Sequence, residues 1–207
     1  LLALELLKHP KFLHWSSTRL ETFRNGTFQL LNTNHRLIKS YYGMQGMKTG
    51  YHRKAGFNLV STAIRKDQRF ISIVLGAKKS SIRNKATKHL LDFGFKNFKK
   101  YDLNFIGEKV PYLATLEGGI LANVSLKVAN TVRILLSSDE RKRLKILPKV
   151  PSNTHAPVKK NQNLGRLEYW LNGKILQKVA LQTEFNVPKQ NIFSGLTGMF
   201  TNLTDIN

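Results

Sequence analysis

The sequence predicts an α+β protein in which antiparallel strands and a helix are followed by a small all-β sandwich domain. Residues 57–64 and 70–75 are two apolar, β-rich runs joined by a polar connection of hairpin length. A segment with helical periodicity follows them. After about Phe98 the pattern changes to short alternating runs, which are typical of a sandwich.

The two apolar runs are nearly continuous, which is typical of central strands buried on both faces. The helix that follows is expected to begin with Ser80 or Ser81 as its N-cap and to end at Gly94. Its apolar face is predicted from four residues at helical spacing: Ile82, Ala86, Leu90 and Phe93. Together these elements predict a helix packed on an antiparallel sheet.

In the second half, residues 124–128 and 132–136 are short alternating runs. Asn172-Gly173 is a strong hairpin signal, and it separates an alternating strand from a return strand at residues 174–181. We therefore place a domain boundary near residue 100. The expected parts are residues 1–99, a sandwich domain at 100–190 and a tail at 191–207.

The two ends of the chain carry weaker signals. The first residue is Leu1 rather than Met, and no signal peptide is recognisable, so we expect the chain to be part of a longer protein. The tail at 191–207 places its apolar residues on one broad helical face, which suggests a weak membrane-surface segment. No stretch reaches the ~20 apolar residues of a membrane span.

The net charge of +22 arises from 34 Lys and Arg residues against 12 Asp and Glu residues. Such an excess attracts polyanions, among them nucleic acid, anionic lipid and acidic cell-wall polymer. Nucleic acid is not expected as a partner, because no nucleic-acid-binding motif is present and aromatic residues do not interleave with the basic ones. The absence of cysteine and of paired histidine ligands predicts no metal site and no cofactor.

Lys48-Thr49-Gly50 is the triplet found as the third signature element of penicillin-binding proteins and class A β-lactamases. The residue types suit a substrate that carries a carboxylate and a scissile carbonyl. Lys48 would supply a positive charge beside a nucleophile, Thr49 would donate its hydroxyl to the carboxylate, and Gly50 would let the substrate lie against the strand. The backbone N–H of Tyr51 would form half of an oxyanion hole.

The sequence around this triplet resembles the D-alanyl-D-alanine carboxypeptidases, which are low-molecular-mass penicillin-binding proteins. The matching blocks lie in the family's order and spacing: Asn-x-Asn at 32–34, Lys-Thr-Gly-Tyr at 48–51, Ala-Gly-Phe-Asn-Leu-Val at 55–60, Val-Leu-Gly-Ala at 74–77 and Leu-Leu-Asp-Phe-Gly-Phe at 90–95. Residues 155–174 are similar to the β-domain that follows the catalytic domain in this family. The resemblance covers nearly the whole chain.

The resemblance implies a partial penicillin-binding-protein/β-lactamase-like domain followed by the sandwich. It also implies a serine-type carboxypeptidase that removes the terminal D-alanine of peptidoglycan pentapeptides through an acyl-serine, and that binds β-lactams. Lys48, Thr49 and Gly50 match the family's active-site residues, and Arg83 matches an arginine near the substrate carboxylate. The implied location is the bacterial periplasm, peripherally at the outer face of the cytoplasmic membrane, where the anionic membrane surface is a further partner.

The chain departs from the family's pattern at the nucleophile. No serine is followed by lysine three positions later or by asparagine two positions later, so the Ser-x-x-Lys and Ser-x-Asn elements are absent. We therefore expect the isolated chain to be inactive. An alternative interpretation is a catalytically inactive fragment that acts as a basic membrane- or partner-binding module.

Overall fold

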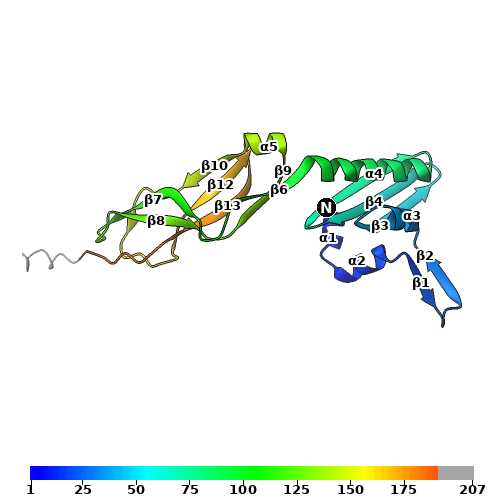
Figure 1. Ribbon diagram of the computed structural model, residues 1–207, viewed down its shortest axis with the longest axis horizontal. Helices are drawn as coiled ribbons and strands as arrows, with labels where there is room; N and C mark the ends of the chain where they lie inside the picture. The colour runs from blue at the N-terminus through cyan, green and yellow to red at the C-terminus, as the bar shows by residue number, and fades with distance from the viewer. Residues whose placement is uncertain (191–207) are drawn as a thin grey trace, which may run out of the picture. The chain divides into compact units, whose positions relative to one another are not determined.

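The computed structural model describes residues 1–190. It divides the chain into two compact units, Leu1–Lys99 and a second unit that begins at Lys100 (Figure 1). Each unit has its own cluster of buried apolar side chains.

The first unit contains four helices and five strands among its 99 residues. The helices are α1 (Leu2–Leu6), α2 (Pro10–Ser17), α3 (His35–Ser40) and α4 (Ser80–Asn97). The strands are β1 (Leu20–Phe23), β2 (Phe28–Leu31), β3 (Met44–His52), β4 (Gly56–Arg65) and β5 (Gln68–Ala77).

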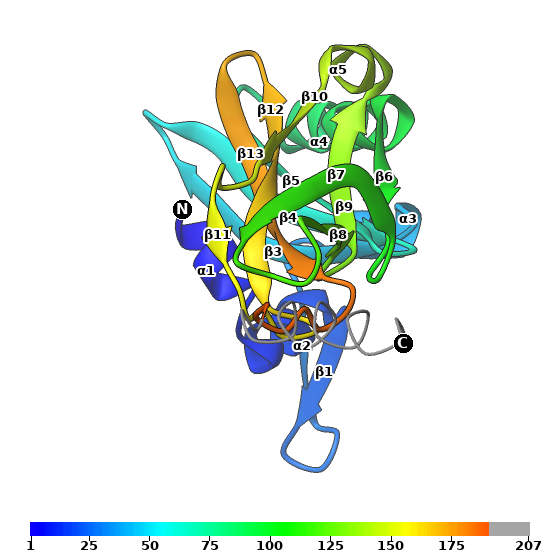
Figure 2. The same ribbon diagram turned by 90° about the vertical axis from the view of Figure 1, so that its left-hand side faces the viewer.

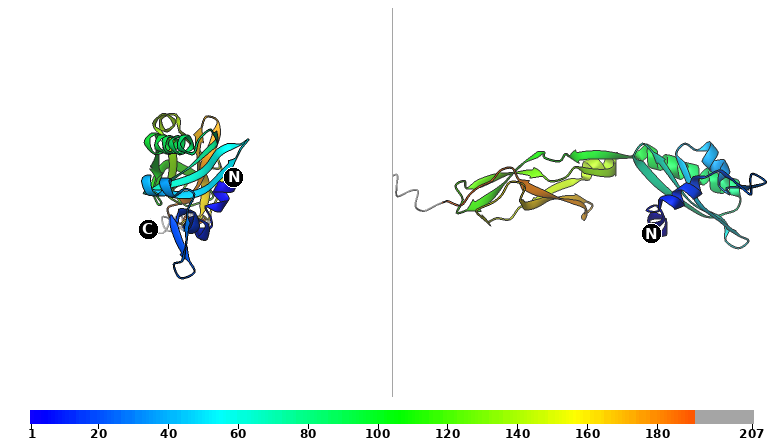
Figure 3. Two further views of the ribbon diagram at one scale, coloured as in Figure 1. Left: turned by 90° about the vertical axis from the view of Figure 1, so that its right-hand side faces the viewer. Right: turned by 90° about the horizontal axis from the view of Figure 1, so that it is seen from below.

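The central sheet of this unit is antiparallel with the order β3-β4-β5, and β1 and β2 form a separate hairpin. Helix α4 covers one face of the sheet, and α1 and α2 lie on the other side (Figure 1 and Figure 3). The core between α4 and the sheet includes Leu59 and Ala63 from β4 and Leu91 from α4. This layered arrangement agrees with the α+β fold expected from the sequence.

The strand prediction was right about position and wrong about burial. Both apolar runs form strands, but only β4 is central, and β5 is an edge strand of the described sheet. Ile73 and Leu75 of β5 are 56% and 71% exposed, so this strand is not buried on both faces. An apolar run in the sequence indicates that a strand surface is suited to burial, but it does not indicate which element covers that surface.

The predicted apolar face of α4 is also wrong. Ile82, Leu90 and Phe93 are exposed, whereas the residues that face the sheet are displaced by about one position: Arg83, Thr87, Leu91 and Gly94. Gly94 does not end the helix, which continues to Asn97, and the N-cap position is Lys79 rather than a serine.

The physical role of Gly94 is close packing. A Cβ atom at this position would lie 3.0 Å from the ring of Phe70 on β5. The glycine therefore lets α4 approach the sheet, and it does so within the helix rather than at its end.

The second unit consists mainly of strands. They are β6 (Phe98–Asn104), β7 (Lys109–Glu117), β8 (Asn123–Val128), β9 (Val132–Ser137), β10 (Lys145–Lys149), β11 (Thr154–His155), β12 (Asn163–Leu171) and β13 (Lys174–Thr183). A short helix, α5 (Ser138–Arg143), lies between β9 and β10, and its N-terminus has a capping box made by Ser137 and Glu140.

Up to residue 190, the strands of the second unit form a six-stranded sheet of order β10-β12-β13-β8-β7-β11 and a two-stranded sheet of β6 and β9. Strands β12 and β13 are antiparallel neighbours (Figure 2). They are joined at Asn172 and Gly173, which both have positive φ angles, as the hairpin signal predicts. The buried cluster includes Leu126, Leu167 and Tyr169, and it makes this part the expected β-sandwich.

The expected membrane-surface segment at 191–207 lies outside the described residues. Within residues 1–190, none of the helices combines the length and the apolar character needed to cross a membrane.

Candidate functional site

The triplet Lys48-Thr49-Gly50 lies in strand β3, which is an edge of the described three-stranded sheet. Its partner β4 places Val60, Leu59 and Asn58 opposite the three residues in that order. Because β3 is paired on one side only, half of its backbone N–H and C=O groups face an open edge. An extended peptide can bind to such an edge as an additional strand.

A pocket of about 560 Å³ lies beside this strand. It brings together the five residues that the sequence singled out: Lys48, Thr49, Gly50, Tyr51 and Arg83. Three further residues line it, namely Thr33, Phe57 and Ser80. Arg83, from α4, therefore lines the same pocket as the residues of β3, although it is 35 positions from Lys48 in the sequence.

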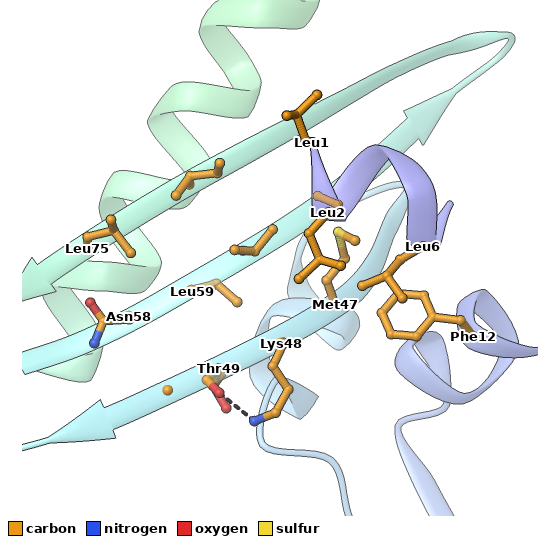
Figure 4. Close-up of a pocket in the computed structure, with 14 residues that line it drawn as sticks. Leu1, Leu2, Leu6, Phe12, Met47, Lys48, Thr49, Asn58, Leu59 and Leu75 are labelled. Carbon is orange, nitrogen blue, oxygen red and sulfur yellow. Dashed lines mark hydrogen bonds between the residues drawn. The ribbon is translucent and has the colours of Figure 1, made fainter. Parts of the chain in front are cut away.

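The Lys48 side chain is exposed, and its Nζ donates a hydrogen bond to the carbonyl oxygen of Thr49 at 2.6 Å (Figure 4). Within residues 1–190 it forms no ion pair with a carboxylate. The ammonium group is thus held against its own strand with its charge uncompensated, and it is available to an anionic group in the pocket.

The hydroxyl of Thr49 is paired with that of Thr33, and the two Oγ1 atoms lie 2.9 Å apart. In such a pair one hydroxyl donates to the other, which leaves the second hydroxyl's hydrogen free to bond elsewhere. When Thr33 donates to Thr49, the hydroxyl of Thr49 can donate to a carboxylate oxygen.

Arg83 is the buried cation of the pocket, with an exposed fraction of only 6%. Its Nε and Nη2 atoms donate to Asn84 Oδ1 at 3.1 and 2.9 Å, and the part of the chain that the structure describes gives it no carboxylate partner. Burial lowers the pKa of Arg83, because desolvation disfavours the charged form. A buried guanidinium without a counter-ion is costly, and an incoming carboxylate would relieve that cost.

A second cavity of about 420 Å³, whose lining is drawn in Figure 4, shares strand β3 with the first. Lys48, Thr49 and Gly50 line it, together with apolar side chains from α1, β4 and β5 such as Leu2, Val60 and Leu75. Its apolar lining makes it less suited to an anionic ligand than the pocket that contains Arg83.

The sequence assigned no role in the site to Thr33, Phe57, Ser80 or Asn34. Thr33 and Asn34 belong to the Asn-x-Asn block, which was a signal for this region without a role assigned to each residue. The Asn34 side chain is buried, and neither its Oδ1 nor its Nδ2 has a hydrogen-bond partner among residues 1–190. Ser80 is the serine of the pocket, and the third residue after it is Arg83 rather than the lysine of Ser-x-x-Lys.

Comparisons with known proteins show what the chain is similar to. The family model described as D-alanyl-D-alanine carboxypeptidase matches residues 1–79, and the model for the C-terminal domain of penicillin-binding protein 5 matches residues 98–189. A D-alanyl-D-alanine carboxypeptidase of Bacillus subtilis, DacF, is 30% identical over 95% of this chain and 51% of its own length. DacC of Escherichia coli is 34% identical over 78% of this chain and 40% of its own length.

The crystal structure of penicillin-binding protein 5 from Haemophilus influenzae is similar, with a TM-score of 0.63 and 27% identity. The match covers 89% of this chain and 53% of that structure. The chain thus spans about half the length of the relatives that it matches. The two family models, the curated relatives and the similar structure all agree, and the chain belongs to the D-alanyl-D-alanine carboxypeptidase family.

Proposed function

We propose that this chain forms part of the active site of a serine-type carboxypeptidase that removes the terminal D-alanine from peptidoglycan pentapeptides. The observation that carries the proposal is the buried guanidinium of Arg83, which lacks a carboxylate partner among residues 1–190 and shares a pocket with Lys48 and Thr49. The names of the relatives support the substrate class, since they are D-alanyl-D-alanine carboxypeptidases.

In this proposal the substrate peptide lies along the open edge of β3. Arg83 and the hydroxyl of Thr49 bind its terminal carboxylate, and the hydroxyl of Thr33 orients that of Thr49. Gly50 leaves room for the peptide backbone, and the N–H of Tyr51 donates to the scissile carbonyl oxygen, whose negative charge grows during acyl transfer. Lys48 stabilises the same anionic region with its ammonium group.

The acyl-transfer step also requires a serine nucleophile and a base. None of the serines in the 207 residues has the lysine or asparagine spacing that the family uses. We propose that a polypeptide segment outside this sequence supplies the nucleophile, and that the chain alone binds substrate without cleaving it.

Substrate binding can be tested on the chain as it stands. A short peptide ending in D-Ala-D-Ala is titrated into the protein, and chemical shifts of β3 amides are followed by NMR. The same peptide with a C-terminal amide is the ligand control. We expect binding that depends on the carboxylate, and Arg83→Gln should weaken it at least about tenfold, since a hydrogen bond to a charged group contributes about 1.5–3 kcal/mol.

Arg19→Gln removes an exposed arginine from the same unit and is the matched control variant. Equal affinity for the acid and the amide, or equal loss in the two variants, would contradict the proposed carboxylate site. A labelled penicillin tests the nucleophile separately. Covalent labelling of this 207-residue chain would show that its own residues complete the reaction.

The finer partners and location are proposals of the same kind. We propose that the protein works in the bacterial periplasm, peripherally at the outer face of the cytoplasmic membrane, and that β-lactams bind where the D-Ala-D-Ala end of the substrate does. Displacement of the D-Ala-D-Ala peptide by a β-lactam in the NMR titration tests the shared site. Fractionation of cells that express the native gene tests the location, and recovery in the cytoplasm would contradict it.

A further inference from the structure

The solvent-facing side of β10, β12 and β13 in the second unit carries an unusual combination of cations and one tryptophan. In β12, Leu167 and Tyr169 belong to the buried core cluster, so the alternate residues Arg166, Glu168 and Trp170 lie on the outer face. The strand register extends this face to both neighbours of β12. We call it the Trp170 face, and its residues are Lys145, Leu147, Lys149, Arg166, Glu168, Trp170 and Lys178, together with the apolar Ile175 and Ala180 of β13.

Glu168 organises this face. Its side chain is only 4% exposed, although it lies on the outer side of the sheet, because its neighbours cover it. It accepts hydrogen bonds from Arg166 Nε at 2.8 Å and from Trp170 Nε1 at 3.1 Å, and Lys178 Nζ lies 3.9 Å away. The Arg166 and Trp170 side chains are therefore fixed in position, as the side chains of a preformed binding surface are.

These contacts also determine the charge state of Glu168. The hydrogen bond from Arg166 is the main cause that holds the pKa of Glu168 below its ordinary value, with smaller contributions from Trp170 and Lys178, and desolvation acts in the opposite direction. The carboxylate remains ionised and already bound, so it does not repel an anion that approaches the exposed cations.

The cations outnumber this carboxylate. Lys145 lies directly opposite Trp170, and Lys149 lies opposite Arg166. Neither lysine forms an ion pair within residues 1–190. The positive charge of this face is therefore largely uncompensated, which favours an anionic ligand.

The face also contains a hollow of about 460 Å³ at the end nearest the β12–β13 turn. The hollow combines two basic side chains, the indole of Trp170 and the amide of Asn172, and Gly173 contributes only backbone to it. The residues that line it are Arg143, Lys145, Leu147, Trp170, Asn172 and Gly173.

We propose that the Trp170 face binds the carboxylate-bearing, peptide-substituted glycan of the cell wall, with a sugar ring against Trp170 in the hollow. The lysines would pair with carboxylates that lie along the strands, and the amide of Asn172 would bond to sugar hydroxyls. The choice of this polymer rests on the proposed carboxypeptidase function, and the shape and charge of the face are independent of it.

Two other anionic ligands fit the face less well. Single-stranded nucleic acid is bound by a series of aromatic side chains on which successive bases stack, and this face has one aromatic residue. A lipid bilayer presents a broad surface, which cannot enter a hollow of this size, whereas a sugar ring can.

The test uses the full chain and the fluorescence of Trp170. The sequence has two tryptophans, so Trp15→Phe leaves Trp170 as the remaining one. Soluble peptidoglycan glycan fragments are titrated into this variant at low and moderate salt. We expect a saturable change in emission that weakens with salt, and a loss of binding when the fragments' carboxylates are converted to methyl esters.

The paired variant Lys145→Glu with Lys149→Glu should weaken binding at least about tenfold, because it replaces two attractive contacts with repulsive ones. Lys159→Glu with Lys160→Glu is the matched control. It makes the same change in net charge in the segment before β12, away from the hollow, and it should bind normally. All four lysines are exposed, and an unchanged Trp170 spectrum without ligand confirms the fold.

The proposal is wrong if the fragments cause no change, or if both charge-reversal pairs lose binding equally. Equal or tighter binding of phosphatidylglycerol vesicles would assign the face to the membrane, and tighter binding of single-stranded DNA would assign it to nucleic acid. With fragments that lack a D-Ala-D-Ala end, Arg83→Gln should leave the change in Trp170 emission unaltered, because such fragments offer the Arg83 pocket no substrate terminus. If the D-Ala-D-Ala peptide does not bind but the glycan fragments still do, only the proposed carboxypeptidase site is overturned.

Discussion

Gly46 of β3 lies so close to α2 that a Cβ atom on it would come within 2.0 Å of the carbonyl oxygen of Ser16. The side chain of Ser16 adds a second link, because its Oγ donates a hydrogen bond to the carbonyl oxygen of Gln45 at 2.9 Å. This contact fixes the start of β3 two residues before Lys48, so it bears on the position of the whole candidate site.

We therefore predict that Gly46→Ala destabilises the first unit by about 2–3 kcal/mol, through the steric clash and the positive φ of 75°. The measurement is the protection of β3 and α2 amides from hydrogen exchange. Gly26→Ala is the control, because Gly26 has a φ of 88° but no atom within 4 Å of its added Cβ. Gly26→Ala should lower the free energy of unfolding by only about 1 kcal/mol. Equal losses of stability in the two variants would show that the contact of Gly46 with Ser16 is unimportant.

The hydroxyl pair of Thr33 and Thr49 gives a graded prediction for peptide binding. Thr49→Val should weaken binding of the D-Ala-D-Ala peptide about tenfold or more, because it removes a hydrogen bond to a charged carboxylate. Thr33→Val should weaken it less, by about threefold, since it removes only the group that orients Thr49. Dissociation constants from the NMR titration measure both effects.

Thr22→Val, on the exposed strand β1, is the control for the change in side-chain chemistry. A larger effect of Thr33→Val than of Thr49→Val would mean that Thr33 itself contacts the carboxylate. Unchanged binding in Thr49→Val would remove Thr49 from the site.

The candidate site could be predicted largely because its strand residues are contiguous. Lys48, Thr49, Gly50 and Tyr51 form one motif, and a single strand carries all of them to the pocket. Thr33 was missed because its contact with Thr49 spans 16 positions and depends on how α3 packs beside β3. Such a contact is a property of the tertiary structure, and spacing in one sequence does not encode it.

Helix α4 shows why the buried face of a helix is harder to predict than its existence. The apolar spacing correctly indicated a helix, but it assigned burial to the stripe that contains Leu90. The sheet instead receives the stripe that contains Arg83 and Gly94, and close packing against Phe70 requires the glycine. Steric fit thus overrides the apolar periodicity at Gly94.

The exposed apolar side chains of the first unit predict poor solubility of the isolated chain. Ile73 and Leu75 on edge strand β5 can pair or pack with other copies. Ile73→Lys with Leu75→Lys should raise the soluble, monomeric fraction, as measured by size-exclusion chromatography with light scattering.

Leu113→Lys with Ile120→Lys adds the same charge at exposed positions of the second unit, and it is the matched control. Equal improvement in both variants would point to net charge rather than to the β5 surface. A monomeric, cooperatively unfolding unmodified chain would contradict the prediction. Residues 100–190 alone should be soluble, because their buried cluster does not draw on the first unit.

The last prediction concerns the stability of the second unit at high pH. Tyr169 is fully buried, and its hydroxyl donates to Asn104 Oδ1 at 2.6 Å. Burial, with a smaller contribution from Glu108, raises the pKa of Tyr169 from 10.0 to about 12. The unfolded chain therefore releases this proton at lower pH than the folded chain does, so stability is retained below pH 10 and falls as the pH rises toward 12.

Tyr169→Phe isolates this effect from the titration of the many lysines. The variant loses the hydrogen bond to Asn104 and should be less stable at neutral pH by about 1 kcal/mol. Its free energy of unfolding should then fall less steeply than that of the unmodified protein between pH 10 and 12, as measured by urea titrations that follow circular dichroism. Parallel pH profiles for the two proteins would show that Tyr169 ionises as readily in the folded state as in the unfolded one, and that its burial does not oppose the charge.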